Sequence, residues 1–473
     1  MYPLLIFSLL KVNDMKKRVL GAIENRKNVS AEIRKDYIDT LKKMVDCKTV
    51  FTDNFENQSE FDKFYKVIEK SFPNLCAKAE RLTFGSGCFV YVIKAKNAKK
   101  NIMLMSHHDV IDGDDKWETN PFDAVEKDGA LFGRGTIDTK TPLFAELQAC
   151  EELLGEGYEF NGINLYIGSS NNEEVSGDGM VLATKYFKEN GIHFETVLDE
   201  GGAITTGMIP TVKAKSAMVA VHEKSRHVYK CKTKQITKGH GGLNPSDDSA
   251  VLRLSSFIGE VGNGKIYKAK FQPEVRATFE THAQYMAFPL SFLFNHLSVF
   301  APIIKKVMQK IPQAKAMLST SITFTTVFAG EKDTPQFKAK EAETTMFLRC
   351  VREDDLLNGL EKIKKIAEKY EVEIEEVERD YCKPSSFTSK PYHILEEVMN
   401  ENFPDVIVAP YLLTAGTDAR RFTNVADCIL RFAPIDLDKK QFDTIHSANE
   451  HIYTENVGQC VCFYKDFIKK ISK

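Results

Sequence analysis

The sequence predicts an α/β protein in which a mostly parallel, mixed sheet lies between helices and is interrupted by a second, α+β domain. Short apolar runs of strand length alternate with segments of helical periodicity in the first part of the chain and again near its end. Polar clusters follow several of these runs directly. The alternation stops near residue 214 and resumes after residue 384. We therefore expect residues 1–213 and 385–473 to form one domain and residues 214–384 to be an inserted α+β domain.

Length and composition are those of a two-domain globular protein. The chain has 473 residues, 43% hydrophobic and 27% charged, which is more than one hydrophobic core usually holds. A net charge of −2 creates no field that attracts nucleic acid or an anionic membrane, so we expect neither as a partner. The ten cysteines include no C-x-x-C pair, which is typical of reduced thiols and predicts a cytoplasmic protein.

Two apolar segments are too short or too interrupted to span a membrane. Residues 288–304 are the most apolar long segment, but Pro289, Asn295 and Pro302 break it, and we expect a buried helix there. Residues 3–10 are apolar but lack the preceding basic residues of a signal peptide, so we expect an ordinary N-terminal extension.

The first part of the chain predicts helices and strands in turn. Residues 30–47 carry apolar side chains at helical spacing, and Ser30 can cap this helix. The elements expected next are a helix at 58–72, strands at 89–93 and 102–105, a helix at 142–154, a strand at 163–167, a helix at 180–190 and a strand at 196–198. Strands that alternate with helices favour parallel pairing.

The inserted and final segments have different patterns. Residues 218–237 alternate like a half-exposed pair of antiparallel strands, which indicates a separate α+β domain. The remaining elements expected are a helix at 249–261, strands at 321–328 and 343–351, helices at 354–370 and 392–402, strands at 406–410 and 428–432, and a helix at 456–471.

Histidine and carboxylate residues follow the strands of the predicted sheet. His107 and Asp109 alternate after the strand at 102–105 and so point the same way, whereas His108 points the opposite way and is expected to be structural. The carboxyl ends of parallel strands meet at one edge of a sheet, where ligands bind. Imidazole and carboxylate groups at one edge are the ligands that zinc prefers.

The whole set predicts two metal ions and a general base. The expected ligands are His107, Asp138, Glu174, Asp199 and His446. Asp199 is favoured over its neighbour Glu200. Glu173, beside a ligand but pointing elsewhere, is free to take a proton from the attacking water.

These residues belong to a longer series of motifs that resembles a known enzyme family. The series comprises His107-His108-Asp109-Val110, Trp117, Asn120-Pro121-Phe122, Asp128-Gly129, Gly133-Arg134-Gly135-Thr136 with Asp138 and Lys140, Asn172-Glu173-Glu174, Leu198-Asp199-Glu200-Gly201-Gly202, Gly239-His240-Gly241-Gly242, Gly416-Thr417-Asp418, and His446 with Asn449-Glu450. In this order and spacing the chain resembles the co-catalytic zinc metallopeptidases that include glutamate carboxypeptidase, carboxypeptidase S, aminoacylase and succinyl-diaminopimelate desuccinylase. The Asp-Glu-Gly-Gly motif and the long inserted domain resemble carboxypeptidase S most.

The resemblance implies a role for each metal ligand. His107 and His446 would each bind one of two zinc ions, for which cobalt or manganese can substitute. Asp138 would bridge the two ions, and Glu174 and Asp199 would complete the separate coordination shells.

The resemblance also implies the catalytic and substrate-binding residues. Glu173 would be the general acid/base, and Asp109 would hydrogen-bond the ring of His107 and fix its tautomer. His240, from the inserted domain, would stabilise the oxyanion. In dimeric relatives this histidine reaches the partner's site. The sequence alone does not decide whether this chain forms a homodimer through the inserted domain. The free carboxylate of the substrate would be bound by Arg349, Gly416 and Thr417.

The chain departs from the family pattern where substrate is recognised. It reads Asp333-Thr334-Pro335, Phe347-Leu348-Arg349 and Thr417-Asp418-Ala419-Arg420-Arg421 where relatives carry other residues. We expect a hydrolase for an amide bond next to a free carboxylate, acting on a short peptide or an N-acyl amino acid. The choice between peptidase and aminoacylase stays open. The alternative is a catalytically inactive binding scaffold, which would lack a metal ligand or the general base.

Overall fold

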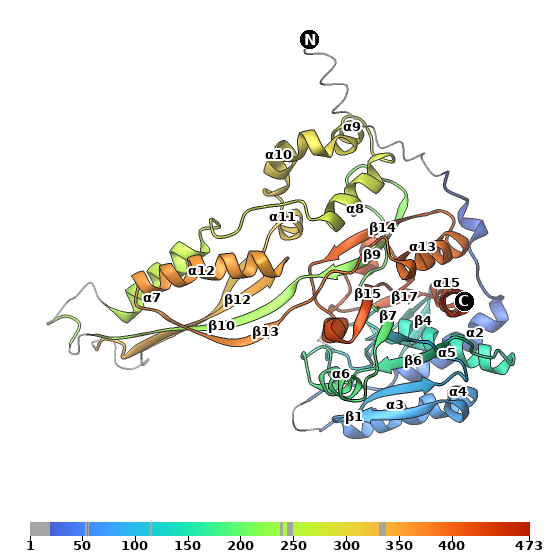
Figure 1. Cartoon of the computed structure of the whole chain (residues 1–473). Helices are drawn as coiled ribbons and strands as arrows, with labels where there is room; N and C mark the ends of the chain where they lie inside the picture. The colour runs from blue at the N-terminus through green and yellow to red at the C-terminus, as the bar shows by residue number, and fades with distance from the viewer. Residues whose placement is uncertain are drawn as a thin grey trace, which may run out of the picture.

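The computed structural model of the chain describes residues 19–473 except 53, 55, 114–115, 237–239, 244–248 and 331–336. A ten-stranded mixed sheet forms its larger part (Figure 1). The strands are β1 (Glu80–Phe84), β2 (Cys88–Ile93), β3 (Lys100–Met105), β6 (Ile163–Ser169), β7 (Phe194–Asp199), β8 (Ile204–Thr205), β9 (Lys215–Glu223), β14 (Val406–Leu413), β15 (Ala426–Arg431) and β16 (Asp436–Leu437). They lie in the order β1-β2-β6-β3-β7-β15-β9-β8-β16, with β14 beside β9. Because β6, β3, β7 and β15 are parallel, these central strands end at one edge.

Helices cover both faces of this sheet because its strands bury side chains on both. In β2, Phe89 and Tyr91 pack in one hydrophobic cluster, whereas Cys88 and Val90 pack in another. The first cluster includes side chains of α2 (Ala31–Val45), α3 (Gln58–Ser71), α4 (Pro73–Lys78), α5 (Lys140–Gly155), α13 (Lys390–Asn402) and α15 (Thr454–Ile471). The second includes α6 (Gly179–Glu189) and the 3-10 helix η2 (Asp418–Asn424). The predicted fold class is confirmed.

A small antiparallel sheet joins two loops that are far apart in the sequence. It consists of β4 (Val125–Lys127), β5 (Ala130–Phe132) and β17 (His451–Tyr453). The loop after β5 carries Asp138, and the loop between α14 (Lys439–Phe442) and β17 carries His446. Pairing of β5 with β17 therefore brings these two residues to the same side of the molecule. One further 3-10 helix, η1 (Ile23–Asn25), lies near the N-terminus.

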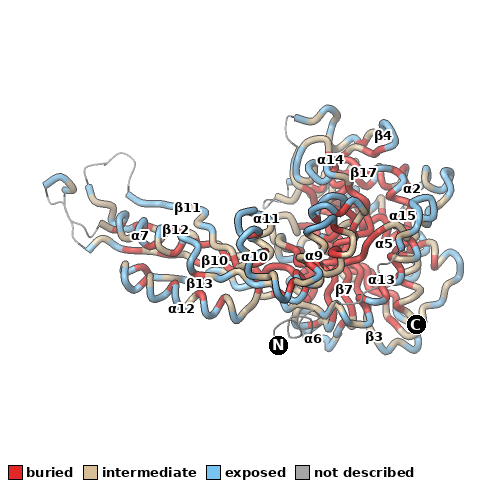
Figure 2. The backbone as a smooth tube through the Cα atoms, turned by 90° about the horizontal axis from the view of Figure 1, so that it is seen from above, coloured by how far each residue is buried: buried red, intermediate tan, exposed pale blue. Residues whose placement is uncertain are grey.

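The inserted domain is a separate antiparallel sheet that extends from the body as a narrow arm (Figures 1 and 2). Its strands are β10 (Ser225–Lys234), β11 (Ser321–Ala329), β12 (Glu341–Cys350) and β13 (Glu373–Asp380), in the order β11-β12-β10-β13. Two helices, α7 (Ala250–Gly262) and α12 (Glu353–Lys369), share a hydrophobic cluster with this sheet. The arm thus has a core of its own.

The strand pair predicted at residues 218–237 is wrong. β9 belongs to the ten-stranded sheet and β10 to the four-stranded sheet, and Lys224 lies between them. The polar side chains of β9 are buried rather than half-exposed because they have partners in the fold; Nδ1 of His222, for example, lies 3.1 Å from Oε1 of Glu274. The chain therefore leaves the large sheet at Lys224, later than the predicted boundary at residue 214.

Four helices of the inserted segment pack against the body. They are α8 (Pro273–Ala283), which lies along β14, α9 (Leu290–Asn295), α10 (Leu297–Met308) and α11 (Pro312–Leu318). The single buried helix expected at 288–304 is instead two helices separated at His296, and only their inner side is buried. No helix among the described residues is long and apolar enough to span a membrane.

Candidate active site

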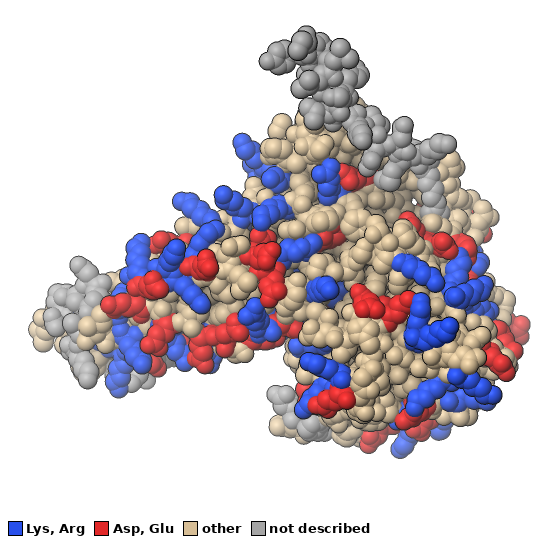
Figure 3. All heavy atoms as spheres, in the orientation of Figure 1, with Lys and Arg blue, Asp and Glu red and all other residues tan. Residues whose placement is uncertain are grey.

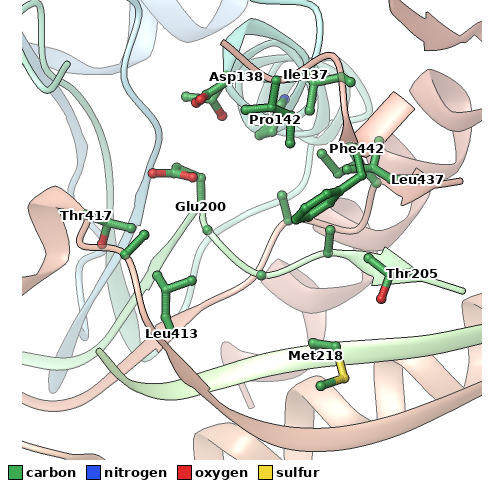
Figure 4. A pocket seen from close by; sticks show the side chains of 18 of the residues that line it. Ile137, Asp138, Pro142, Glu200, Thr205, Met218, Leu413, Thr417, Leu437 and Phe442 are labelled. Carbon is green, nitrogen blue, oxygen red and sulfur yellow. The ribbon is translucent and has the colours of Figure 1, made fainter. Parts of the chain in front are cut away.

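The polar residues that follow β3, β6 and β7 meet at one edge of the large sheet. Met105, the last residue of β3, lies level with Gly168 of β6 on one side and with Asp199 of β7 on the other. The loops that leave these strands therefore carry His107, Glu173-Glu174 and Glu200 to the same place. A cavity of about 420 Å³ opens there, and Asp138 and Glu200 both project into it (Figure 4).

Two histidines and two carboxylates face one another at this cavity, which Asp138, Glu174 and His446 line. Nε2 of His107 lies 3.0 Å from Oδ1 of Asp138, and Nε2 of His446 lies 3.0 Å from Oδ2 of the same carboxylate. Nε2 of His446 is also 3.1 Å from Oε2 of Glu174. Ligand atoms of His107, Asp138 and Glu174 all lie within 4.8 Å of one another, so this donor set fits a divalent cation. Asp138 presents one oxygen to each imidazole, as a carboxylate shared by two ions would.

The carboxylates of this group stabilise positive charge on the imidazoles. Hydrogen bonds with Asp138 and Glu174 raise the pKa of His446 to about 10. Burial lowers the pKa of His107, but the carboxylates of Asp109 and Asp138 outweigh it and raise that pKa well above its ordinary value. The surroundings therefore favour the positive charge that a bound divalent ion supplies.

Asp109 positions both His107 and the loop that carries the two glutamates. Its carbonyl oxygen lies 2.9 Å from Nδ1 of His107, and because a carbonyl can only accept, Nδ1 donates and Nε2 faces Asp138. The buried carboxylate accepts hydrogen bonds from the backbone N–H of Glu173 at 3.1 Å and of Glu174 at 3.0 Å. Its Oδ1 is 3.5 Å from the ring. The predicted contact of Asp109 with the ring of His107 is therefore present, with the backbone carbonyl of Asp109 closer to the ring than its carboxylate.

Glu173 lines the same cavity but lies outside the group of facing ligands. Its Oε1 is 3.9 Å from Nη1 of Arg420. Burial is the main cause that raises the pKa of Glu173 well above its ordinary value, and the negative charges of Asp418 and Asp109 add to it. A buried carboxyl group with a raised pKa can both accept and release a proton near neutral pH.

The structure places Glu200, and not Asp199, in the cavity. Both oxygens of Asp199 accept backbone hydrogen bonds, from the N–H of Glu200 at 2.9 Å and of Ala419 at 2.9 Å. Asp199 is turned toward η2, whereas Glu200 lines the cavity together with Asp138 (Figure 4). This geometry favours Glu200 as the ligand and corrects the choice of Asp199. The cause is local, since the side chains of adjacent residues in an extended segment point in opposite directions.

The structure brings Arg349 close to the Gly416-Thr417 turn at the cavity wall. Nη1 of Arg349 would lie 2.8 Å from a Cβ atom at residue 416, so the absence of a side chain at Gly416 lets the guanidinium approach the turn closely. Gly416 and Thr417 line the cavity. The hydroxyl and the N–H of Thr417 both donate to Oε2 of Glu223, at 3.1 and 3.3 Å. Gly416 thus lies at the cavity wall beside Arg349, whose Nη1 donates to the carbonyl oxygen of Lys224 at 3.3 Å, while the Thr417 hydroxyl is engaged by Glu223.

His240 does not reach this cavity within one chain. It follows β10, at the end of that strand away from the body, where it pairs with Phe337 through an isolated β-bridge. Its exposed ring accepts a hydrogen bond at Nδ1 from the N–H of Gly242 at 3.1 Å. Gly239 of the predicted motif and the departure at 333–335 lie outside the described residues.

Glu450 has no role predicted from the sequence, yet it positions Asp138. Its buried carboxylate accepts hydrogen bonds from the N–H of Ile137 at 2.7 Å and of Asp138 at 3.0 Å, and from Nη1 of Arg134 at 2.8 Å. Glu450 and the glycine-rich turn of Asp138 both belong to the motifs that carry the resemblance. Their occurrence together is the sequence feature that could have indicated a contact between them.

Arg420 likewise connects the inserted domain to the site. Its Nε donates to Oδ2 of Asp380 on β13 at 2.7 Å, while its Nη1 faces Glu173. Arg420 stands in the turn motif after Thr417, but only the fold shows that a residue of the inserted domain holds it. Residues of both domains therefore contribute to the environment of Glu173, Arg420 directly and Asp380 through Arg420.

The fold and the His/Asp/Glu group define the class of protein as a metallohydrolase. A match to the peptidase family M20/M25/M40 covers residues 103–470, so the chain belongs to this family. The resemblance read from the motifs is thereby confirmed.

Two curated relatives match nearly the whole chain. The probable carboxypeptidase S-like 2 of Dictyostelium discoideum is 29% identical over 451 residues, covering 92% of this chain and 86% of that protein. The N-fatty-acyl-amino acid synthase/hydrolase PM20D1 of Xenopus tropicalis is 29% identical over 452 residues, with the same coverage.

Two solved structures share the fold. An M20 family metallo-carboxypeptidase from Sulfolobus solfataricus superposes with a TM-score of 0.67 at 18% identity, covering 92% of this chain and 99% of that chain. A dinuclear metal-binding peptidase of the same family from Bacillus subtilis superposes with a TM-score of 0.58 at 9% identity, covering 93% and 98%. The chain is thus an M20 metallohydrolase with a candidate His/Asp/Glu metal centre.

Proposed function

We propose that the chain hydrolyses the amide bond of N-acyl amino acids whose acyl group is apolar. The observation that carries this proposal is the division of the cavity into a charged and an apolar end. Phe442, Leu437 and Met218 lie on the side of the cavity away from Glu200 (Figure 4). Further apolar side chains line the cavity, namely Met208, Ile435 and Ile445, with Ile137 and Pro142 beside Asp138 and Leu413 beside Thr417 (Figure 4). Such a surface binds a hydrocarbon chain by removing it from water, at about 25 cal/mol for each Å² buried.

The charged end would hold two zinc ions, with cobalt or manganese as substitutes. His107 and Glu200 would bind one ion, His446 and Glu174 the other, and Asp138 would contact both. When bound, such ions polarise a carbonyl group and lower the pKa of water. The distances of 3.0 Å from each oxygen of Asp138 to a different imidazole support this assignment.

The protein's own residues would move the proton and orient the substrate. Glu173 would take a proton from the attacking water and give it to the leaving nitrogen. Asp109 would keep Glu173 and Glu174 in place through their backbone N–H groups. Arg349, beside Gly416, would bind the carboxylate of the amino acid and so place the amide bond next to Glu173.

The test is a comparison of substrates on the purified protein loaded with zinc. N-acylphenylalanines with acyl groups from acetyl to a long alkyl chain are assayed beside dipeptides with free amino groups. We expect kcat/KM to rise with acyl length and to exceed the value for the dipeptides. Equal or higher rates on free dipeptides would contradict the acyl-amino-acid proposal.

A carboxypeptidase activity is the second candidate. The name of the Dictyostelium relative, probable carboxypeptidase S-like 2, favours it, and the apolar end of the cavity would then take an apolar side chain of a peptide. Peptides with blocked N-termini and an apolar penultimate residue would then be cleaved faster than any N-alkanoyl amino acid. An inactive scaffold is disfavoured because imidazoles, carboxylates and a buried base meet at one cavity. A purified protein that neither binds zinc nor turns over any of these substrates would support the scaffold alternative.

A homodimer through the inserted domain would give His240 a role in the partner's cavity. The exposed ring of His240, outside the cavity of its own chain, supports this arrangement. Mixing a His240→Ala variant with a Glu173→Gln variant tests it. Hybrid dimers would regain activity that neither variant has alone, whereas additive, unrestored rates would contradict the shared site.

A further inference from the structure

The helical lobe of residues 288–311, built around α9 and α10, has apolar side chains on its outside as well as its inside. Leu297, Ile304 and Met308 of α10 are buried in a cluster with the body. The opposite face of the same helix carries Val299, Ile303 and Val307, spaced by four residues. We call the exposed apolar residues of the lobe the outer stripe; they are between 46% and 82% exposed and are Phe288, Phe292, Val299, Ile303, Val307 and Ile311.

The outer stripe is continuous from one helix to the other. The ring of Phe292 on α9 lies 5.7 Å from the ring of Phe300 on α10, a half-buried residue outside the stripe, so the two helices are in contact next to the stripe. A soluble surface rarely exposes so many large apolar side chains side by side without a binding role. The lobe therefore needs a partner that accepts hydrocarbon.

The sequence that forms the lobe carries only basic charges. Residues 281–330 contain four lysines and no aspartate or glutamate, although the whole chain has a net charge of −2. Lys306 and Lys310 are exposed on or next to α10, and no ion pair joins them to an acidic residue in the described part of the chain. Figure 3 shows this part of the surface as mostly uncharged, with several basic side chains along its flank and an acidic patch beside them. A partner that covers the stripe must therefore be anionic.

A second copy of the chain satisfies these conditions poorly. A two-fold contact would place the lysines of one stripe against the lysines of the other, because the same patch meets itself. Like charges opposed across an interface are unfavourable. A lipid surface with anionic headgroups meets both requirements, since its acyl region accepts apolar side chains and its phosphates accept lysine.

We propose that the outer stripe docks the protein on an anionic lipid surface, with Val299, Ile303 and Val307 entering the acyl region and the lysines meeting the headgroups. The expectation of no membrane partner rested on the net charge of the whole chain, which hides this local excess. The inference does not depend on the proposed substrate, because the lobe and the cavity use different residues.

The experiment is co-sedimentation of the full-length protein with vesicles. The vesicles are phosphatidylcholine alone or phosphatidylcholine mixed with phosphatidylserine, each at low and high salt. The stripe variant is Val299→Ser/Ile303→Ser/Val307→Ser, and the charge variant is Lys306→Glu/Lys310→Glu. A matched control, Val251→Ser/Leu252→Ser/Leu357→Ser, removes exposed apolar side chains from α7 and α12 on the arm. All of these positions point away from a core, and near-wild-type Tm values verify folding.

The expected result is binding to the mixed vesicles that weakens with salt. The stripe variant should bind at least about tenfold more weakly, because each aliphatic side chain that enters the acyl region contributes hydrophobic binding free energy. The charge variant should lose the preference for phosphatidylserine, by about tenfold or more. The arm control should bind like the wild type.

Three outcomes would overturn the proposal. The first is a wild type that sediments with neither kind of vesicle. The second is a stripe variant that binds lipid normally, while deletion of residues 1–18 abolishes binding, because the N-terminal segment would then be the lipid contact. The third is a wild-type dimer that the stripe variant converts to a monomer without any lipid binding, which would assign the stripe to a second copy.

Discussion

The two ends of the active-site cavity are built in opposite ways. At the charged end, a distant acidic residue holds each ligand loop through backbone hydrogen bonds, Asp109 for Glu174 and Glu450 for Asp138. At the apolar end, Met208 and Phe442 are each 44% exposed, and the wall consists of separate side chains from several loops. Replacing a carboxylate that accepts hydrogen bonds from two N–H groups leaves at least one of them without an acceptor. An apolar side chain in the wall can be replaced by a larger or smaller one without such a loss. The comparison teaches that buried carboxylates hold the polar groups in place at one end, whereas the other end is a partly exposed wall of separate side chains.

The largest effect is expected from Glu173→Gln at the charged end. The amide keeps the shape of the side chain but cannot accept the proton, so kcat should fall by about 10³-fold or more. Zinc content, measured by elemental analysis, should stay at the wild-type value because Glu173 is not a ligand. A variant with near-wild-type turnover would show that the base lies elsewhere.

A paired comparison of Glu200→Gln and Asp199→Asn sharpens the ligand assignment. Glu200→Gln should weaken one of the two zinc sites by more than the ~10–100-fold that loss of an outer partner costs. Asp199→Asn should retain both ions and lose roughly 1–3 kcal/mol of unfolding free energy, because one backbone N–H loses its acceptor. Zinc titration and thermal unfolding distinguish the two. The reverse pattern would return the ligand role to Asp199.

Asp109→Asn should have an intermediate effect. An asparagine offers one acceptor oxygen where the carboxylate serves the N–H groups of both Glu173 and Glu174. Zinc affinity should therefore fall by about 10–100-fold, while added zinc restores part of the activity. Unchanged affinity in a zinc titration would mean that the loop is held by other contacts.

The smallest effect is expected at the apolar end, from Phe442→Ala. Loss of this wall should lower kcat/KM for a long-chain N-acyl amino acid by about tenfold, which corresponds to the hydrophobic contact of one large side chain. The N-acetyl substrate is the internal control and should change little. An equal loss for both substrates would show that Phe442 supports the charged end instead.

The charged edge could be predicted from the sequence because strand ends and metal chemistry both leave local signals. The polar residues after β3, β6 and β7 directly follow apolar runs, and parallel strands place such residues together. The choice between Asp199 and Glu200 could not be made, since it depends on which of two adjacent acids turns toward η2. Only the contact of Asp199 with the N–H of Ala419, far along the chain, decides it.

The segment after residue 213 was harder to predict because tertiary partners replace solvent there. The alternation along β9 looked half-exposed, yet its polar side chains are buried against residues such as Glu274 that no local pattern identifies. The same limit applies to α10. Its sequence is apolar on both faces, and periodicity alone cannot distinguish a fully buried helix from one that leaves an apolar face uncovered.

The most direct test of the central claim is a crystal structure of the zinc-loaded protein with anomalous diffraction at the zinc edge. We expect two peaks in the cavity, both in contact with Asp138, one with His107 and Glu200 and the other with His446 and Glu174. A single peak, no peak at Asp138, or coordination by Asp199 in place of Glu200 would contradict the account.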